Sequence, residues 1–269
     1  MYADLNGTLR EADDLCIHPG DRGLTLGDGV FETIAVRAGR ALRLAAHLDR
    51  LHRGLATLAF ETVPARDALH AAVERVIAAN ALETGVIRLT VTRGAAARGL
   101  APQGGGPPTV LVTASDALPP ADPVSAVIST RVRRNEHSPT SGLKSLSYLD
   151  NVLARQEAAE RGAGEALLRN TAGHIVEATV ANVFAVIDGE LCTPPLADGA
   201  LPGVLRAAIL NAEAVREVHL TLDELLRADE VILSNSLSVR PVVALDGHPI
   251  GAGVPGPWQR RLRGFTASV

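Results

Sequence analysis

The chain contains 25 arginines and a single lysine, Lys144, which lies in the polar stretch SGLKSLSYLDNVLARQ. On a solvated surface arginine and lysine serve almost equally well, so a chance surface position is the simple explanation. The two differ where chemistry requires an amine that can lose its proton, because guanidinium stays charged at any physiological pH. A lysine amine can also form an imine with an aldehyde. The surroundings of Lys144 must therefore decide between these explanations.

Imine chemistry with pyridoxal phosphate requires supporting groups that the sequence offers in several places. A carboxylate must face the pyridine nitrogen, and Glu177 in the apolar stretch HIVEATVANVF is the candidate. The phosphate requires an arginine together with main-chain N–H groups at a helix N-terminus. The candidates are Arg50 in HLDRL, the turn Gly203, Val204 and Leu205 in LPGVLRAAIL, and Ser234 and Ser236 in SNSLSV. Each feature alone is ordinary, since carboxylates often end strands and helices often begin at such turns.

The elements that must position these residues alternate between strands and helices. In the first half, residue patterning predicts strands over 29–39, 84–94 and 108–115 and helices over 44–58 and 65–79. In the second half it predicts a strand over 125–132, a helix over 148–162, a four-strand antiparallel meander over 165–194, a helix in 201–214 and one or two strands over 230–247. The stretch SDALPPADP indicates a linker. We therefore expect an α+β fold with an N-terminal α/β domain over 1–116, a linker over 117–123 and a C-terminal domain over 124–269.

Taken in order, the motifs resemble the class IV (fold type IV) family of pyridoxal-phosphate enzymes. This family includes branched-chain aminotransferases, D-amino-acid aminotransferases and 4-amino-4-deoxychorismate lyases. The matching segments are DRGLTLGDGVFET, HLDRL, TRGAAARGL, LKSLSYLDNVLARQEA, EATVANVF, LPGVLR and NSLSVRPV. The resemblance implies the two-domain fold of D-amino-acid aminotransferases, with pyridoxal 5′-phosphate held by the larger C-terminal domain.

The resemblance also implies a role for each matching residue. Lys144 carries the cofactor and shuttles a proton, and Glu177 binds the pyridinium nitrogen. The phosphate is bound by Arg50, the main chain of Val204 and Leu205, and the Ser236 hydroxyl. Tyr148 resembles a tyrosine that contacts the phenolic oxygen of the cofactor, and Arg98, in the glycine-rich loop over 94–108, resembles a substrate-carboxylate ligand. Family members are usually homodimers, and we expect the same here.

Within the family, GDGVFET and NSLSVRPV are most like the 4-amino-4-deoxychorismate lyases, which eliminate pyruvate and give 4-aminobenzoate for folate biosynthesis. Phe31 stands where D-amino-acid aminotransferases usually have tyrosine, and Thr33 where branched-chain enzymes usually have glycine; both are expected to line the substrate pocket. NSLSVRPV is slightly shorter than the usual lyase form, and Leu205 replaces a hydroxyl residue. A transaminase acting on D-alanine or branched-chain amino acids is the first alternative. A non-enzymatic protein that kept the fold is the second, and the retained Lys144 and Glu177 argue against it.

Composition excludes several other classes. The net charge of −4 does not indicate a basic surface for binding nucleic acid, and no run of about 18 apolar residues is present to span a membrane. The N-terminus lacks the pattern of a secretion signal, so a cytoplasmic location and small-molecule substrates are expected. The eight histidines show no metal-type spacing, and His47 and His52 are expected on a helix surface, so no metal site is predicted.

Overall fold

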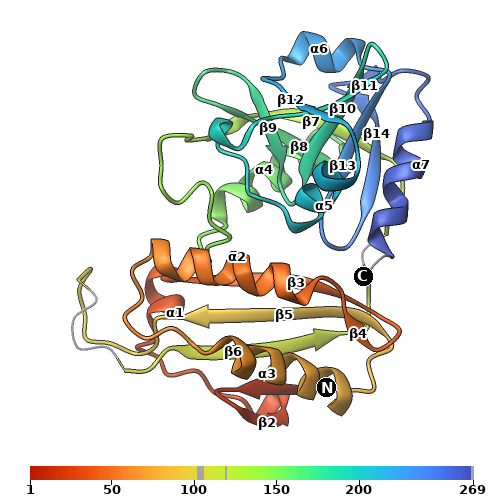
Figure 1. The fold of residues 1–269 in the computed structure, drawn as a ribbon. Coiled ribbons are helices and arrows are strands. Elements are labelled where there is room, and N and C mark those ends of the chain that lie inside the picture. Colours follow the sequence, from red (N-terminus) through yellow and green to blue (C-terminus); the bar gives the residue numbers. More distant parts are fainter. Residues whose placement is uncertain (102–105, 119, 268–269) are drawn as a thin grey trace. The chain divides into compact units, whose positions relative to one another are not determined.

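A computed structural model describes residues 1–101, 106–118 and 120–267 of the chain. These residues form two compact units (Figure 1). The first comprises Met1–Leu118 and Lys144–Ser147, and the second comprises the described residues of Pro119–Leu143 and Tyr148–Ser268. The predicted domain boundaries put Lys144 in the C-terminal domain. In the structure its segment belongs to the first unit, because its backbone pairs with a strand of that unit.

The first unit is built on an antiparallel sheet with strand order β2-β1-β6-β5-β3-β4. Its strands are β1 (Tyr2–Leu5), β2 (Thr8–Glu11), β3 (Gly29–Arg37), β4 (Arg40–Ala41), β5 (Thr84–Thr92) and β6 (Thr109–Ser115). The predicted strands over 29–39, 84–94 and 108–115 are confirmed as β3, β5 and β6. The β1–β2 hairpin was not predicted, although Asn6 and Gly7, both with positive φ, form a turn pair typical of two-residue hairpins.

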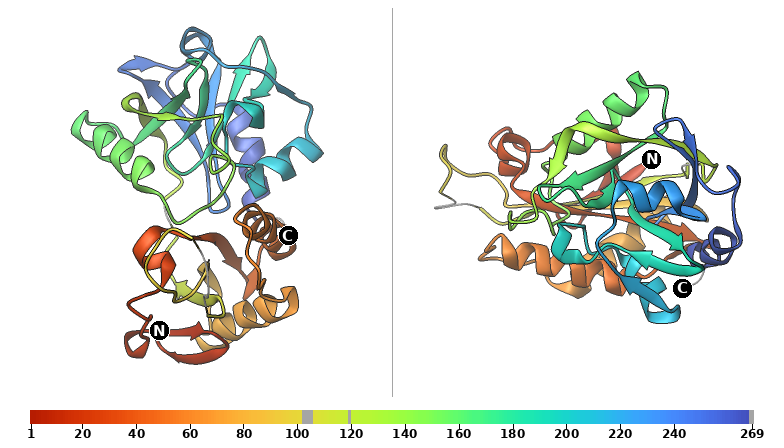
Figure 2. Two further views of the ribbon diagram at one scale, coloured as in Figure 1. Left: turned by 90° about the vertical axis from the view of Figure 1, so that its left-hand side faces the viewer. Right: turned by 90° about the horizontal axis from the view of Figure 1, so that it is seen from above.

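Helices α2 (Leu44–Thr57) and α3 (Arg66–Ala79) pack their apolar sides against one face of this sheet (Figure 2). Both helices were predicted, and their buried leucines and valines join Val30, Ile34 and Val36 of β3 in one core cluster. Because side chains alternate across a strand, Phe31 and Thr33 lie on the opposite face of β3. A short helix α1 (Arg22–Leu26) and a 3₁₀ turn η1 (Ala12–Asp14) complete this unit.

The second unit is built on a mixed nine-stranded sheet with order β12-β11-β10-β13-β14-β7-β8-β9, in which β15 pairs with β14. The strands are β7 (Val124–Arg134), β8 (Glu165–Asn170), β9 (Ile175–Ala178), β10 (Asn182–Ile187), β11 (Glu190–Thr193), β12 (Val215–Glu217), β13 (Glu230–Ser234), β14 (Val239–Leu245) and β15 (His248–Pro249). β9 also pairs with β10, so the path from β10 through β13, β14, β7 and β8 closes on itself. The predicted antiparallel meander is confirmed as β8 to β11.

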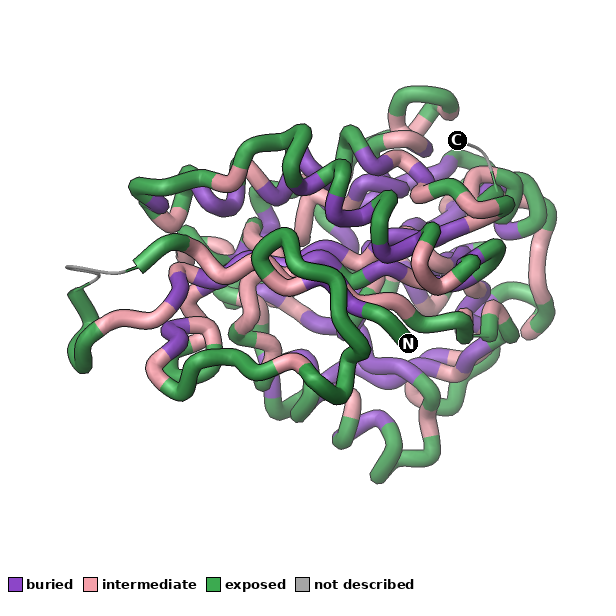
Figure 3. The backbone as a smooth tube through the Cα atoms, turned by 90° about the horizontal axis from the view of Figure 1, so that it is seen from below, coloured by how far each residue is buried: buried purple, intermediate pink, exposed green. Residues whose placement is uncertain are grey.

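The helices of the second unit are α4 (Leu149–Glu160), α5 (Val204–Ala212), α6 (Leu222–Arg227) and α7 (Pro257–Arg263), with 3₁₀ turns η2 (Leu196–Asp198) and η3 (Gly264–Thr266). The predicted helices over 148–162 and in 201–214 are confirmed as α4 and α5, whereas α7 was not predicted. Buried residues follow the strands, and exposed residues gather in turns and on outer helix faces (Figure 3). The α+β prediction is thus confirmed. In the part of the chain that the structure describes, no helix has the length and apolar character needed to cross a bilayer.

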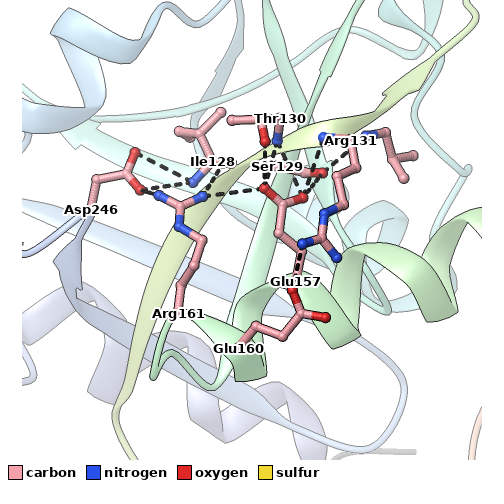
Figure 4. Close-up of polar contacts among 9 residues, drawn as sticks. Ile128, Ser129, Thr130, Arg131, Glu157, Glu160, Arg161 and Asp246 are labelled. Atoms are coloured by element: carbon pink, nitrogen blue, oxygen red, sulfur yellow. Dashed lines mark hydrogen bonds and ion pairs between the residues drawn. The ribbon is translucent and has the colours of Figure 1, made fainter.

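Glu157 fastens α4 to the sheet (Figure 4). The pairing of β7 with β8 shifts register between Ile128 and Arg133, where the carboxylate of Glu157 accepts from the Thr130 N–H at 2.9 Å and the Ser129 hydroxyl at 2.7 Å. Burial alone raises the pKa of Glu157, but these donors outweigh it and lower the pKa to about 2. The helix that directly follows the Lys144 segment is therefore anchored by an ionised side chain.

Candidate active site

Lys144 lies in an extended segment on the edge of β3. The Phe31 N–H donates to the Lys144 carbonyl at 2.9 Å, and the Leu146 N–H donates to the Gly29 carbonyl at 3.0 Å. A Cβ at Gly29 would stand 2.5 Å from the Val91 carbonyl oxygen and 2.9 Å from Leu146 Cδ1. Glycine in the motif GDGVFET is therefore required for the close approach that seats the lysine segment.

The aromatic ring of Phe31 lies between two cationic groups. Lys144 Nζ is 4.4 Å from the ring centroid, and the Arg88 guanidinium carbon is 3.8 Å from it. Thr33 pairs with Arg88 across β3 and β5, on the same sheet face as Phe31. Lys144 and Phe31 thus lie in contact, and Thr33 lies on the same sheet face; a role in a substrate pocket stays a prediction. The structure adds the exposed Arg88, which sequence reasoning missed because arginine is common throughout this chain.

Arg50 belongs to a buried ionic cluster on the other face of β3. Its Nε donates to Glu32 Oε1 at 2.8 Å and its Nη2 to Oε2 at 2.5 Å, while His47 Nδ1 lies 2.6 Å from Oε2. Burial raises the pKa of Glu32, but the Arg50 and His47 donors outweigh it and lower the pKa to about 2. Desolvation lowers the pKa of His47, so the neutral ring donates to Glu32. The expectation that His47 lies on a helix surface was wrong, since its side chain is buried.

Arg98 is exposed. Arg22 holds the two residues that follow it in the loop. The Arg22 guanidinium donates to the carbonyls of Gly99 and Leu100, both at 2.9 Å, and its Nε donates to Asp28 at 2.8 Å. Burial raises the pKa of Asp28, and Arg93 together with Arg22 lowers it below its ordinary value. Residues 102–105 of the predicted substrate loop lie outside the described residues.

In the second unit Glu177 lies near the end of β9 and is almost fully buried. Its Oε1 is 2.7 Å from Arg134 Nη2, and its Oε2 accepts from the Leu201 N–H at 3.0 Å. Across the sheet Glu177 faces Asn182 of β10 and Leu168 of β8. No lysine stands near Glu177 in the chain, and the structure supplies Arg134 as its charge partner.

The N-terminus of α5 is shaped by a close contact between Gly203 and Asn182. A Cβ at Gly203 would stand 2.0 Å from Asn182 Oδ1, and Asn182 Nδ2 donates to the Leu201 carbonyl at 2.9 Å. Val204 and Leu205 form the first turn of α5, with their side chains in the core. Their N–H groups are among those that an α-helix leaves without an intrahelical partner. Asn182 was not predicted as a site residue, because the sequence marks it only by its place at the start of a strand.

Ser236 occupies a tight turn between β13 and β14 that Asn235 organises. Asn235 Oδ1 accepts from the Leu237 N–H at 2.9 Å and the Ser238 N–H at 3.0 Å. The Ser234 hydroxyl is buried and has no hydrogen-bond partner among the described residues. Tyr148 is half-buried and occupies the N-cap position of α4, where its side chain makes no capping hydrogen bond.

These features fit the cofactor that the motifs predict. A glycine cradle at a helix N-terminus and a buried serine hydroxyl without a partner suit a phosphate group. A buried carboxylate whose two oxygens are oriented by Arg134 and the Leu201 N–H suits a protonated ring nitrogen. The amine of the chain's single lysine, placed against an aromatic ring, suits an aldehyde partner.

Comparison with known proteins identifies the class. The Amino-transferase class IV family matches residues 29–245, and the chain belongs to this family, whose members depend on pyridoxal 5′-phosphate. The fold is accordingly fold type IV, as the motifs predicted.

Individual relatives carry different names. The chain is 31% identical to the D-alanine aminotransferase of Bacillus licheniformis, over 98% of this chain and 95% of the relative. The branched-chain amino acid aminotransferase from Escherichia coli superposes with a TM-score of 0.90 at 30% identity, covering 97% of this chain and 91% of that one. A Legionella pneumophila protein named "Putative 4-amino-4-deoxychorismate lyase" superposes with a TM-score of 0.87 at 30% identity, covering 94% of each chain. The chain is thus similar both to transaminases and to a protein with the lyase name.

Proposed function

We propose that this pyridoxal-phosphate enzyme is a 4-amino-4-deoxychorismate lyase that eliminates pyruvate and releases 4-aminobenzoate. The observation that carries the proposal is the pair of cations around Phe31. Lys144 Nζ and the Arg88 guanidinium lie 4.4 Å and 3.8 Å from the centroid of the same ring. A substrate that carries one carboxylate on its ring and one on its enolpyruvyl group matches a sheet face that presents an exposed arginine beside the lysine. The GDGVFET motif, with Phe31 and Thr33, supports the same choice.

In this proposal each side chain has a stated task. The bound cofactor supplies an aldehyde for Lys144 and a ring that accepts electrons. Lys144 Nζ takes the proton from the substrate carbon that bears the amine. The carboxylate of Glu177, oriented by Arg134 and the Leu201 N–H, accepts a hydrogen bond from the ring nitrogen. Arg88 and the loop residue Arg98 orient the substrate carboxylates.

The cofactor phosphate is assigned to the groups that the motifs name. Arg50 is oriented by Glu32, which accepts from two nitrogens of the guanidinium. The first-turn N–H groups of Val204 and Leu205 and the Ser236 hydroxyl complete the set, and Tyr148 is assigned to the phenolic oxygen. Support comes from the order of the family motifs and from the Gly203–Asn182 contact.

Amino transfer is the second candidate, because relatives named D-alanine and branched-chain aminotransferase match almost the whole chain.

We also propose that the protein is a cytoplasmic homodimer that acts on small molecules. A stripe of exposed apolar residues on α4, formed by Leu149, Val152 and Leu153, supports the dimer.

The test supplies holoenzyme with freshly generated 4-amino-4-deoxychorismate and follows 4-aminobenzoate and pyruvate. Parallel reactions contain D-alanine or L-leucine with 2-oxoglutarate. We expect equal rates of both products without any 2-oxo acid, and at least 10³-fold less turnover in Lys144→Ala, because a base and nucleophile contribute on this scale. Arg88→Gln is expected to raise KM for the lyase substrate about tenfold, with Arg40→Gln, also an exposed arginine of this sheet, as the matched control. Steady amino transfer without 4-aminobenzoate would overturn the lyase assignment.

A further inference from the structure

Two histidines and an aspartate from distant parts of the chain converge in the second unit. His174, Asp198 and His219 each offer a ligand atom, and these atoms lie within 4.8 Å of one another. His219 Nδ1 is 2.9 Å from both oxygens of Asp198, and His174 Nδ1 is 3.9 Å from Asp198 Oδ1. The two imidazole rings stack with centroids 4.5 Å apart. Sequence spacing did not reveal this group because His219 follows Asp198 by 21 residues.

Main-chain contacts hold together the three segments that carry these side chains. Asn170 accepts from the His174 N–H at 2.9 Å through its Oδ1 and donates through Nδ2 to the Asp198 carbonyl at 3.3 Å. Ile175, next to His174, donates its N–H to the carbonyl of Leu220, next to His219, at 2.8 Å. The β8–β9 turn, the η2 turn and the segment before α6 are thereby tied together. The fold therefore brings the three residues of the cluster to one place.

One atom of the cluster points to a ligand. His174 Nδ1 is buried and has no hydrogen-bond partner among the described residues. Its 3.9 Å separation from Asp198 Oδ1 is too long for a hydrogen bond. Two ligands of a tetrahedral ion, each about 2.0–2.1 Å from the metal, stand roughly 3.3–3.5 Å apart, slightly closer than His174 Nδ1 and Asp198 Oδ1. Rotation of the two stacked imidazole rings would turn both nitrogens toward one ion. The side chain of His219 is 59% exposed, which leaves an entry path and room for a water ligand.

We propose that His174, Asp198 and His219 bind a divalent transition-metal ion, with Zn²⁺ as the best match. Two neutral imidazoles and one carboxylate form a borderline ligand set that suits Zn²⁺ over Mg²⁺ or Ca²⁺, which prefer oxygen ligands only. The buried Asp198 supplies a negative charge beside the two nitrogens, and metal binding would occupy the orphaned His174 Nδ1.

The proposed ion would also stiffen the segment that follows η2. Asp198 ends η2, and Leu201, three residues later, donates its N–H to Glu177. Metal binding should therefore slow hydrogen exchange of backbone amides between Asp198 and Leu201. This consequence concerns backbone stability and does not rest on the proposed activity of the enzyme.

In the experiment, Zn²⁺ is titrated into chelator-treated holoenzyme and binding is measured by calorimetry. In a parallel titration, the visible absorbance of bound Co²⁺ reports nitrogen and oxygen ligation. We expect one ion per chain with a micromolar or lower Kd, slower exchange over 198–201, and a thermal midpoint about 5 °C higher at saturation. His174→Ala, Asp198→Asn and His219→Ala should each weaken binding at least tenfold. His248→Ala removes an exposed histidine elsewhere and is the matched control.

Two controls keep the result interpretable. Circular dichroism and the metal-free thermal midpoint establish that each variant folds, and unchanged visible absorbance of the bound cofactor excludes Zn²⁺ held by the cofactor. Absence of binding in the wild-type protein would overturn the proposal and leave the cluster as a hydrogen-bonded group only. Equal affinity in the wild type and in the His174→Ala/His219→Ala double variant would also overturn it.

Discussion

Glu32 shows how a single charged residue is accommodated inside the core of the first unit. It alternates with Val30 and Ile34 on the β3 face that α2 covers, so its carboxylate is removed from water. Unpaired burial of such a charge costs several kcal/mol, and here Arg50 and His47 supply donors to both oxygens. The same contacts fix the orientation of Arg50, the residue proposed to bind phosphate.

Replacing this carboxylate tests that account through its pH dependence. Glu32→Gln should lower the free energy of unfolding at pH 7 by about 3–5 kcal/mol, because Arg50 loses its buried partner. The folded-state pKa is about 2, below the ordinary value of 4.5, so the stabilisation from Glu32 is complete above about pH 4.5 and is lost as the pH falls toward 2. The difference in unfolding free energy between variant and wild type should therefore become smaller below pH 4.5. Urea denaturation from pH 7 to pH 3 measures it.

Glu61→Gln is the matched control, since Glu61 is exposed. It should leave the unfolding curve unchanged within about 0.5 kcal/mol across this pH range. Wild-type and Glu32→Gln curves that stay parallel down to pH 3 would contradict the assigned ionisation.

Residue types predicted part of the candidate site and missed the rest for physical reasons. Lys144 and Glu177 stand out because each is chemically unusual where it lies in the sequence. Arg134, Asn182 and Arg88 carry no such signal, because their importance arises from contacts made across the sheets. The pairing of Arg134 with Glu177, for example, joins β7 to β9 and leaves no local pattern in the chain.

At the scale of elements, periodicity predicted most strands and helices because their apolar positions repeat regularly. The β1–β2 hairpin escaped because β2 is exposed along its whole length and shows no alternation. Helix α7 was not predicted because its three arginines interrupt the apolar pattern that Trp258 and Leu262 would otherwise give. The position of Lys144 on the edge of β3 is a tertiary feature that periodicity does not encode.

The turn at the N-terminus of α5 leaves no room for a side chain at position 203. Gly203→Ala would drive a Cβ into Asn182 Oδ1 and displace the Asn182 contact with the Leu201 carbonyl. We expect at least tenfold weaker binding of pyridoxal 5′-phosphate to the apoenzyme and a loss of about 1–3 kcal/mol in unfolding free energy. Absorbance titration and urea denaturation measure the two effects. Gly264→Ala is the control, because a Cβ there meets nothing within 4 Å and φ is −56°. Unchanged cofactor affinity in Gly203→Ala would show that this turn does not bind the cofactor phosphate.

For the whole molecule, the proposed homodimer rests on surface that a single copy leaves exposed. One face of α4 packs Asn151, Ala154 and Ala158 into its own unit. The other face presents Leu149, Val152 and Leu153, whose residues are 76%, 47% and 47% exposed. A second copy that covers this stripe would bury these side chains, and apolar burial is the main favourable term in subunit association.

Charging the stripe should therefore separate the subunits. The double variant Leu149→Glu/Leu153→Glu would place two carboxylates in the interface of each copy, where burial without partners is costly. We expect the dimer to dissociate at least 100-fold more readily, about 2.7 kcal/mol in association free energy. Light scattering after size-exclusion chromatography would give about 28.0 kDa for the variant and twice that for the wild type. Val254→Glu alters another exposed apolar residue and should leave the dimer intact. A wild-type protein that is monomeric at all concentrations, or a double variant that stays dimeric, would show that α4 does not form the interface.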